Sequence, residues 1–149
     1  MKKILLVLLL LLVLVGCGNK TKTQTTICTA ELEGILVENT LVSTGDNVDS
    51  VVYKTTISVD DMLAPYLASA AEEYGKNFTG LTGVSYEYTV EGNTLVEITK
   101  IDYSTVDYQD LVRLGLLELE EGVIPTPFVM PYKDMKAQME ASGCTCKIK

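Results

Sequence analysis

Apolar and polar side chains alternate with a period of two in the first part of the predicted domain, which is typical of half-buried β-strands. Three runs carry this alternation: 25–32, 35–43 and 51–59. Gly34 separates the first two runs, and the turn sequence Gly45-Asp46-Asn47 separates the second from the third. Because short connections of this kind join neighbouring antiparallel strands, we expect the three runs to form a meander.

The period changes from two to about 3.6 after residue 60, which predicts a helix. Asp60 or Asp61 is placed to cap its N-terminus, and Pro65 fits the first turn. Gly75 suits the position just beyond its C-terminus. One face carries an apolar stripe that should pack on the sheet, formed by Leu63, Leu67, Ala70 and Tyr74.

A second pair of strands is predicted on either side of a tight turn at Gly92-Asn93. The alternating runs are 84–90 and 95–103. The register of this hairpin stays open. A two-residue loop pairs Val90 with Leu95, whereas a three-residue loop pairs Val90 with the residue before Leu95.

Shorter elements are predicted toward the C-terminus. Asp107 can cap a short helix over residues 108–117. A last helix begins at Pro131 and ends at Gly143, and the acidic, proline-containing segment between the two helices is predicted to be a loop. Residues 144–148 can add a short edge strand.

Together these elements predict an α+β fold. We expect a curved antiparallel sheet of about five strands, with one main helix packed on it and short C-terminal helices. Residues 26–149 are assigned to a single domain, because a chain of this size buries roughly two-thirds of its unfolded surface in one core.

A continuous apolar run, Ile4–Val15, precedes the alternating region and follows the positive charges of Lys2 and Lys3. The run is too short to cross the ~30 Å hydrocarbon core of a bilayer as a helix. Its length and its charged flank are those of a signal peptide.

The end of this run, Leu14-Val15-Gly16-Cys17, resembles the lipobox of bacterial lipoproteins. The resemblance implies that residues 1–16 are a signal peptide and that Cys17 carries diacylglycerol with fatty acids such as palmitate. Residues 17–25 are small and polar, which is typical of a flexible tether. We therefore expect a lipid-anchored, extracytoplasmic protein of the bacterial cell envelope. An ordinary secreted protein, cut nearby, is the alternative.

The charge of the chain limits its partners. The chain carries a net charge of −8, and between Glu31 and Glu140 twenty acidic residues face only six basic ones. Nucleic-acid phosphates require basic surfaces, so we expect no nucleic-acid partner. The same acidity should repel the domain from the anionic membrane surface to which its lipid would tie it.

Three cysteines remain once Cys17 is assigned to the lipid: Cys28, Cys144 and Cys146. Export would allow a disulfide. Cys28 can pair with either C-terminal cysteine and close a loop of more than 100 residues. The alternatives are a bridge between Cys144 and Cys146, thiols that stay unpaired, or a redox-active Cys-Thr-Cys sequence.

Few residues carry catalytic or metal-binding chemistry. The chain has no histidine, which excludes Ser-His and Cys-His catalysis and histidine metal sites. The weak candidates for ligand or ion contact are Tyr86, Tyr88, Asp102 and Asp107. The plainer interpretation places the tyrosines between sheet and helix, and makes the aspartates a strand-end turn and a helix cap. We predict no metal and no cofactor.

Three stretches, Gly45–Val48, Gly80–Tyr86 and Ile101–Asp107, have the order and spacing of segments in the YehR-like bacterial lipoproteins. The chain resembles this family, whose domain has no assigned function, over roughly residues 26–114. The resemblance implies an α+β domain on a lipid anchor, and it implies no activity.

The sequence therefore favours a non-catalytic binding or accessory module that recognises an envelope protein or a small ligand. The main alternative is an envelope enzyme, either a thiol redox protein using Cys144 and Cys146 or a carboxylate-based hydrolase. A surface spacer without a ligand of its own is a third hypothesis.

Overall fold

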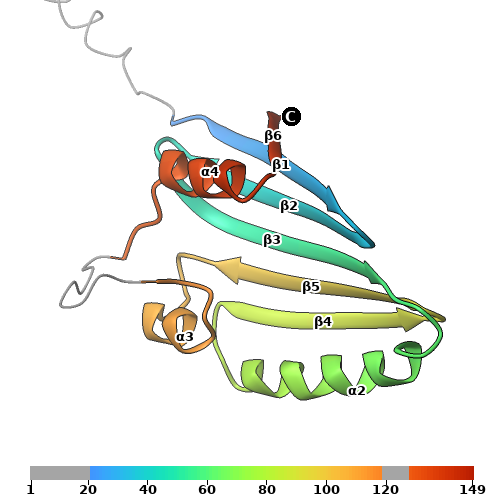
Figure 1. Ribbon diagram of the computed structural model, residues 1–149. Coiled ribbons are helices and arrows are strands. Elements are labelled where there is room, and N and C mark those ends of the chain that lie inside the picture. The colour runs from blue at the N-terminus through green and yellow to red at the C-terminus, as the bar shows by residue number, and fades with distance from the viewer. Residues whose placement is uncertain (1–20, 119–127) are drawn as a thin grey trace, which may run out of the picture.

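The segments with a period of two form one antiparallel sheet (Figure 1). The structure is a computed structural model that describes residues 21–118 and 128–149. Its strands are β1 (Thr23–Leu32), β2 (Ile35–Thr44), β3 (Asn47–Ser58), β4 (Val84–Glu91), β5 (Thr94–Asp102) and β6 (Thr145–Ile148). They lie in the order β4-β5-β3-β2-β1-β6, and every neighbouring pair is antiparallel.

The sheet has three hairpins, and in each of them a two-residue loop connects the two strands. The β4–β5 hairpin pairs Val90 with Leu95, so the shorter of the two predicted loops is confirmed. Gly92, its first loop residue, has φ +58°, and no non-glycine residue in the described ranges has a positive φ. A type II′ turn requires this combination, which explains the glycine at that position.

The sheet has six strands rather than about five, because the C-terminal residues pair with β1. β6 has four residues and is the short edge strand predicted within residues 144–148. At the other end, β1 begins at Thr23, where Thr23 pairs with Thr44. The last three residues of the predicted tether therefore belong to the sheet, where branched threonine side chains fit well.

The helices are α2 (Ala64–Gly75), the 3-10 helix η2 (Lys76–Phe78), α3 (Tyr108–Arg113) and α4 (Tyr132–Ala141). α2 lies along β4, and α4 lies over β1 to β3 (Figure 1). Val51 packs in the core under α4 and Ile57 packs under α2. Because these residues are six positions apart on β3, both helices cover the same face of the sheet. The predicted α+β class is confirmed.

The buried face of α2 is rotated from the predicted stripe. Leu67 and Ala71 are buried against Leu95, whereas Leu63 is 51% exposed and Ala70 is exposed. Apolar residues of α2 form two overlapping stripes on its surface. The packing of the helix on β5 buries one of these stripes.

Gly75 has a different role from the predicted helix end. It is the last residue of α2 with φ −60°, and the chain continues into η2. A Cβ at this position would lie 3.1 Å from a ring carbon of Tyr86. The glycine therefore allows the Tyr86 ring to pack against the helix backbone.

The structure confirms most of the predicted bounds of the C-terminal helices. α4 begins after Pro131, its Met135 and Met139 are buried, and Gly143 follows it with φ +93°. α3 ends at Arg113 instead of residue 117, because Gly115 at φ +70° turns the chain out of the helix.

Two apolar clusters form the core. The larger lies under α4 and α3 and includes Leu41, Ile101 and Leu111, and the smaller joins α2 to Leu95. None of the helices within the described ranges is long and apolar enough to cross a membrane. The predicted signal peptide, Cys17 and most of the predicted loop 118–128 lie outside the described residues.

Candidate functional site

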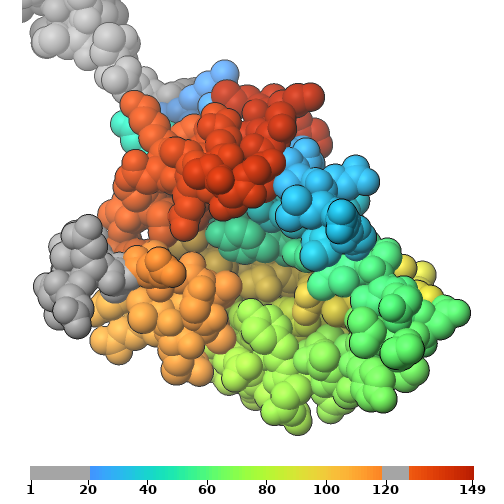
Figure 2. Space-filling model, in the orientation of Figure 1, coloured from blue at the N-terminus to red at the C-terminus, as the bar shows by residue number. Residues whose placement is uncertain are grey.

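The helix-bearing face is hollowed between α2 and α4 (Figure 2). Two adjacent cavities occupy this region, and Tyr53 on β3 lines both of them. We call the one beneath α4, of about 340 Å³, the methionine pocket. We call the one beside α2, of about 330 Å³, the tyrosine recess. The methionine pocket includes Asn39, Tyr53, Tyr103, Met135, Met139 and Cys144, and the tyrosine recess is lined by Tyr53, Thr55, Tyr74, Tyr86, Glu97 and Thr99.

Asn39 is the polar residue placed deepest in the methionine pocket. It pairs with Cys28 on β1 and with Tyr53 on β3, so it points to the helix-bearing face between them. Asn39 is 6% exposed, and its Oδ1 has no hydrogen-bond partner among the residues that the structure describes. Leaving a buried acceptor without a hydrogen bond costs about 1–3 kcal/mol of folding free energy. A ligand that donates a hydrogen bond to this oxygen would recover that cost.

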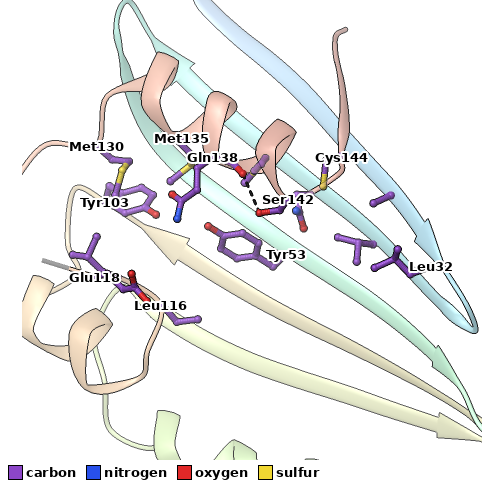
Figure 3. Close-up of a pocket in the computed structure, with 15 residues that line it drawn as sticks. Leu32, Tyr53, Tyr103, Leu116, Glu118, Met130, Met135, Gln138, Ser142 and Cys144 are labelled. Atoms are coloured by element: carbon purple, nitrogen blue, oxygen red, sulfur yellow. Dashed lines mark hydrogen bonds between the residues drawn. The ribbon is translucent and has the colours of Figure 1, made fainter.

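Tyr53 and Tyr103 bring two phenols to the same pocket (Figure 3). Tyr53 comes from β3, and Tyr103 directly follows β5. Burial raises the pKa of both hydroxyl groups above the usual value for tyrosine. Both phenols therefore stay protonated at neutral pH and can hydrogen-bond to a ligand.

Four sulfur-containing side chains line part of the remaining wall. Met130 and Met135 approach from the α4 side, and the half-buried Cys144 lies near Ser142 (Figure 3). Unbranched methionine side chains adapt to ligands of different shape. The Ser142 hydroxyl donates to the Gln138 carbonyl, 3.0 Å away. The lining is thus mainly apolar, with a few hydrogen-bonding groups.

The tyrosine recess has a different chemistry. The rings of Tyr74 and Tyr86 meet nearly at right angles, with centroids 5.1 Å apart and an interplanar angle of 83°. Phe78 stacks behind Tyr86 at 5.2 Å. The Tyr86 hydroxyl donates to the Glu97 carboxylate on the neighbouring strand. Burial first, and then this carboxylate, raise the pKa of Tyr86.

The structure separates the four residues predicted as weak ligand contacts. Tyr86 lines the tyrosine recess, while Tyr88 is 39% exposed beside it, with ring centroids 6.2 Å apart. Asp102 accepts hydrogen bonds from the backbone N–H and the hydroxyl of Ser104, and these bonds lower its pKa. Asp107 caps α3 by accepting from the Gln109 N–H. The two aspartates act as the turn and the cap of the plainer interpretation, and their ligand contact stays a prediction.

Sequence reasoning missed Asn39, Tyr53 and Glu97 as site residues. A signal was present, because Asn39 and Glu97 occupy the inward phase of strands whose other inward residues are mostly apolar. What the sequence lacked was the pairing of β3 with β5, which places Tyr53 beside Thr99.

The cysteine pairing is one of the predicted alternatives. Cys28 on β1 forms a disulfide with Cys146 on β6, and Cys144 is a free thiol. Within the described ranges, no three His, Cys, Asp or Glu residues gather in a way that could hold a metal ion.

No protein-family model and no curated protein sequence matches the chain. Among solved structures, the NMR structure of Escherichia coli YehR is similar, with a TM-score of 0.64, 19% identity, and coverage of 87% of this chain and 93% of YehR. The fold is YehR-like. An NMR structure of a protein from Streptococcus pneumoniae TIGR4 is also similar, with a TM-score of 0.58, 17% identity, and coverage of 89% of this chain and 88% of that one. At these identities the likeness shows the fold alone.

Proposed function

We propose that this YehR-like domain is a non-catalytic binding module of the bacterial cell envelope, held on the membrane by lipid on Cys17. Its methionine pocket takes a small, mostly apolar ligand that carries a hydrogen-bond donor. The observation that carries the proposal is Asn39, which lines a cavity of about 340 Å³ and whose buried Oδ1 has no hydrogen-bond partner among the described residues. Cavities of this size and lining are typical of small-molecule sites.

The other groups of the pocket support binding rather than catalysis. The phenols of Tyr53 and Tyr103 are held protonated by burial, so neither is a base at neutral pH. A thiol redox protein using Cys144 and Cys146 is the second candidate, favoured by the free thiol two residues from the disulfide. The redox candidate is the weaker of the two, because Cys146 is paired with the distant Cys28. A disulfide reduction potential below about −300 mV would exclude a redox function.

The pocket can be tested with 1-naphthol, which has a donor hydroxyl, against 1-methoxynaphthalene, which has none. We expect saturable binding of 1-naphthol, followed by fluorescence, and about five- to tenfold weaker binding of the ether. Asn39→Leu should abolish this preference without loss of folding stability, because it removes an unsatisfied polar atom. Equal affinity of the two probes for the unchanged protein would show that Asn39 does not select a donor.

The anchor is tested separately, in cells. Cys17→Ser removes the acceptor of the lipid, so the protein should leave the membrane fraction and lose metabolic labelling by palmitate. Cys144→Ser is the matched control and should stay in the membrane fraction. A Cys17→Ser protein that is processed but still bound to the membrane would contradict lipid anchoring.

A further inference from the structure

The tyrosine recess joins aromatic walls and a carboxylate. Tyr74 and Tyr86 form two aromatic walls at 83°, and Glu97 brings a carboxylate to the same cavity. The Tyr86 hydroxyl donates a hydrogen bond to this carboxylate, and burial first and then the charge of Glu97 raise the pKa of both tyrosines. None of the described residues that line this cavity is basic.

Positive charge is the complement of this arrangement. The face of an aromatic ring carries negative potential, so a cation against one or two rings is attracted to them. Glu97 adds a full negative charge, and the hydrogen bond from Tyr86 holds that carboxylate in place. A cation bound there would meet no competing lysine or arginine on the described walls.

The recess favours an organic cation over a metal ion. Hard metal ions require several oxygen ligands, and this cavity offers a single carboxylate. An alkylated ammonium group is weakly hydrated, so contact with aromatic walls costs it little. A cavity of about 330 Å³ has room for a group of this size.

We propose that the tyrosine recess binds a small organic cation of the alkylammonium class, with Tyr74 and Tyr86 as its aromatic walls and Glu97 as its counter-charge. This site is distinct from the methionine pocket. The two cavities share only Tyr53 among the residues that line them.

Choline chloride is the probe, and 3,3-dimethylbutan-1-ol, its neutral isostere, is the comparison. In NMR titrations of the purified protein at constant ionic strength, choline should bind saturably and shift the ring resonances of Tyr74 and Tyr86. The isostere should bind at least about fivefold more weakly. Asn39→Leu should leave choline binding unchanged, which separates this site from the methionine pocket.

Matched variants identify the source of the attraction. Glu97→Gln keeps a hydrogen-bond acceptor for Tyr86 but removes the charge, and Tyr74→Leu removes one ring from a residue that is 40% exposed. Each should weaken choline binding about fivefold or more. Tyr74→Phe keeps the ring, and Glu87→Gln removes an equal charge from the opposite face, where Glu87 pairs with Lys100. Both controls should stay within about twofold of the unchanged protein.

Three results would overturn the proposal. The first is a choline titration that does not saturate, and the second is equal affinity for the neutral isostere. The third is unchanged choline binding in Glu97→Gln and Tyr74→Leu, with both variants folded by circular dichroism.

Discussion

At the scale of single residues, burial raises the pKa of four tyrosines on the helix-bearing face. They are Tyr53, Tyr74, Tyr86 and Tyr103, and burial is the largest cause in each case. The folded protein therefore holds these protons more tightly than the unfolded chain does. The associated stability is fully present below the ordinary tyrosine pKa of about 10 and is lost as the pH rises above it.

We therefore expect the protein to lose stability steeply above pH ~10. Urea unfolding at pH 8 and pH 10.5 should show a lower midpoint at the higher pH. Tyr103→Phe should reduce the difference between the two midpoints, whereas Tyr66→Phe, a change at a tyrosine that is 66% exposed, should not. Equal midpoints at both pH values would contradict the expectation.

The residue scale also shows what sequence could not supply. Alternation indicates which face of a strand Asn39 and Glu97 occupy, but it does not say which strand lies next to which. Tyr53 joins the two cavities only because β3 pairs with β2 on one side and with β5 on the other. The second of these pairings joins Tyr53 to Thr99, 46 positions further along the chain, and no local pattern encodes it.

At the scale of elements, short helices depend on their ends. α3 has six residues, so few internal hydrogen bonds support it. Asp107 satisfies the Gln109 N–H at its N-terminus, and Arg113 pairs with Asp110 at 3.0 Å within it. Leu111, at its centre, is 1% exposed and ties the helix to the core.

Asp107→Ala should lower the free energy of unfolding by about 1 kcal/mol, because it leaves a helix N–H without its cap. Asp107→Asn keeps an acceptor and should change stability by a few tenths of a kcal/mol at most. Glu72→Ala, on the exposed side of α2, controls for the lost charge. Both variants are measured by urea unfolding. If Asp107→Ala lowers the free energy of unfolding no more than Glu72→Ala does, the role of the cap is contradicted.

Elements with long, regular periodicity were predictable, and their ends were less so. The β4–β5 hairpin lies where strict alternation around a glycine turn predicted it, and the structure selects one of the two registers that the sequence left open. α3 ends early at Gly115, and the buried phase of α2 differs from the predicted one. Gly115 ends α3 locally, whereas in α2 packing on β5 selects one of two overlapping apolar stripes.

At the scale of the whole molecule, the Cys28–Cys146 disulfide joins the first and last strands across a sequence separation of 118. Closing a loop of that length restricts the unfolded chain, which the chain-entropy model equates with about 4–5 kcal/mol. The sequence could not choose between Cys144 and Cys146. Antiparallel pairing of β1 with β6 sets Cys146 opposite Cys28 and makes the choice.

Cys144→Ser should leave stability within about 0.5 kcal/mol, since it removes only a free thiol. Adding Cys146→Ser to it should lower the free energy of unfolding by about 4–5 kcal/mol in urea. The double variant prevents Cys144 from replacing Cys146 in the bridge. Equal stability of the single and double variants would show that the bridge does not constrain the unfolded chain.

The same disulfide has a consequence for resistance to proteolysis. Every peptide bond between Cys28 and Cys146 lies inside a covalent ring. A protease that cuts once within this ring opens the backbone but releases no fragment, because both pieces stay joined through the sulfur atoms. Only a second cut, or reduction of the disulfide, would let a piece of the domain escape.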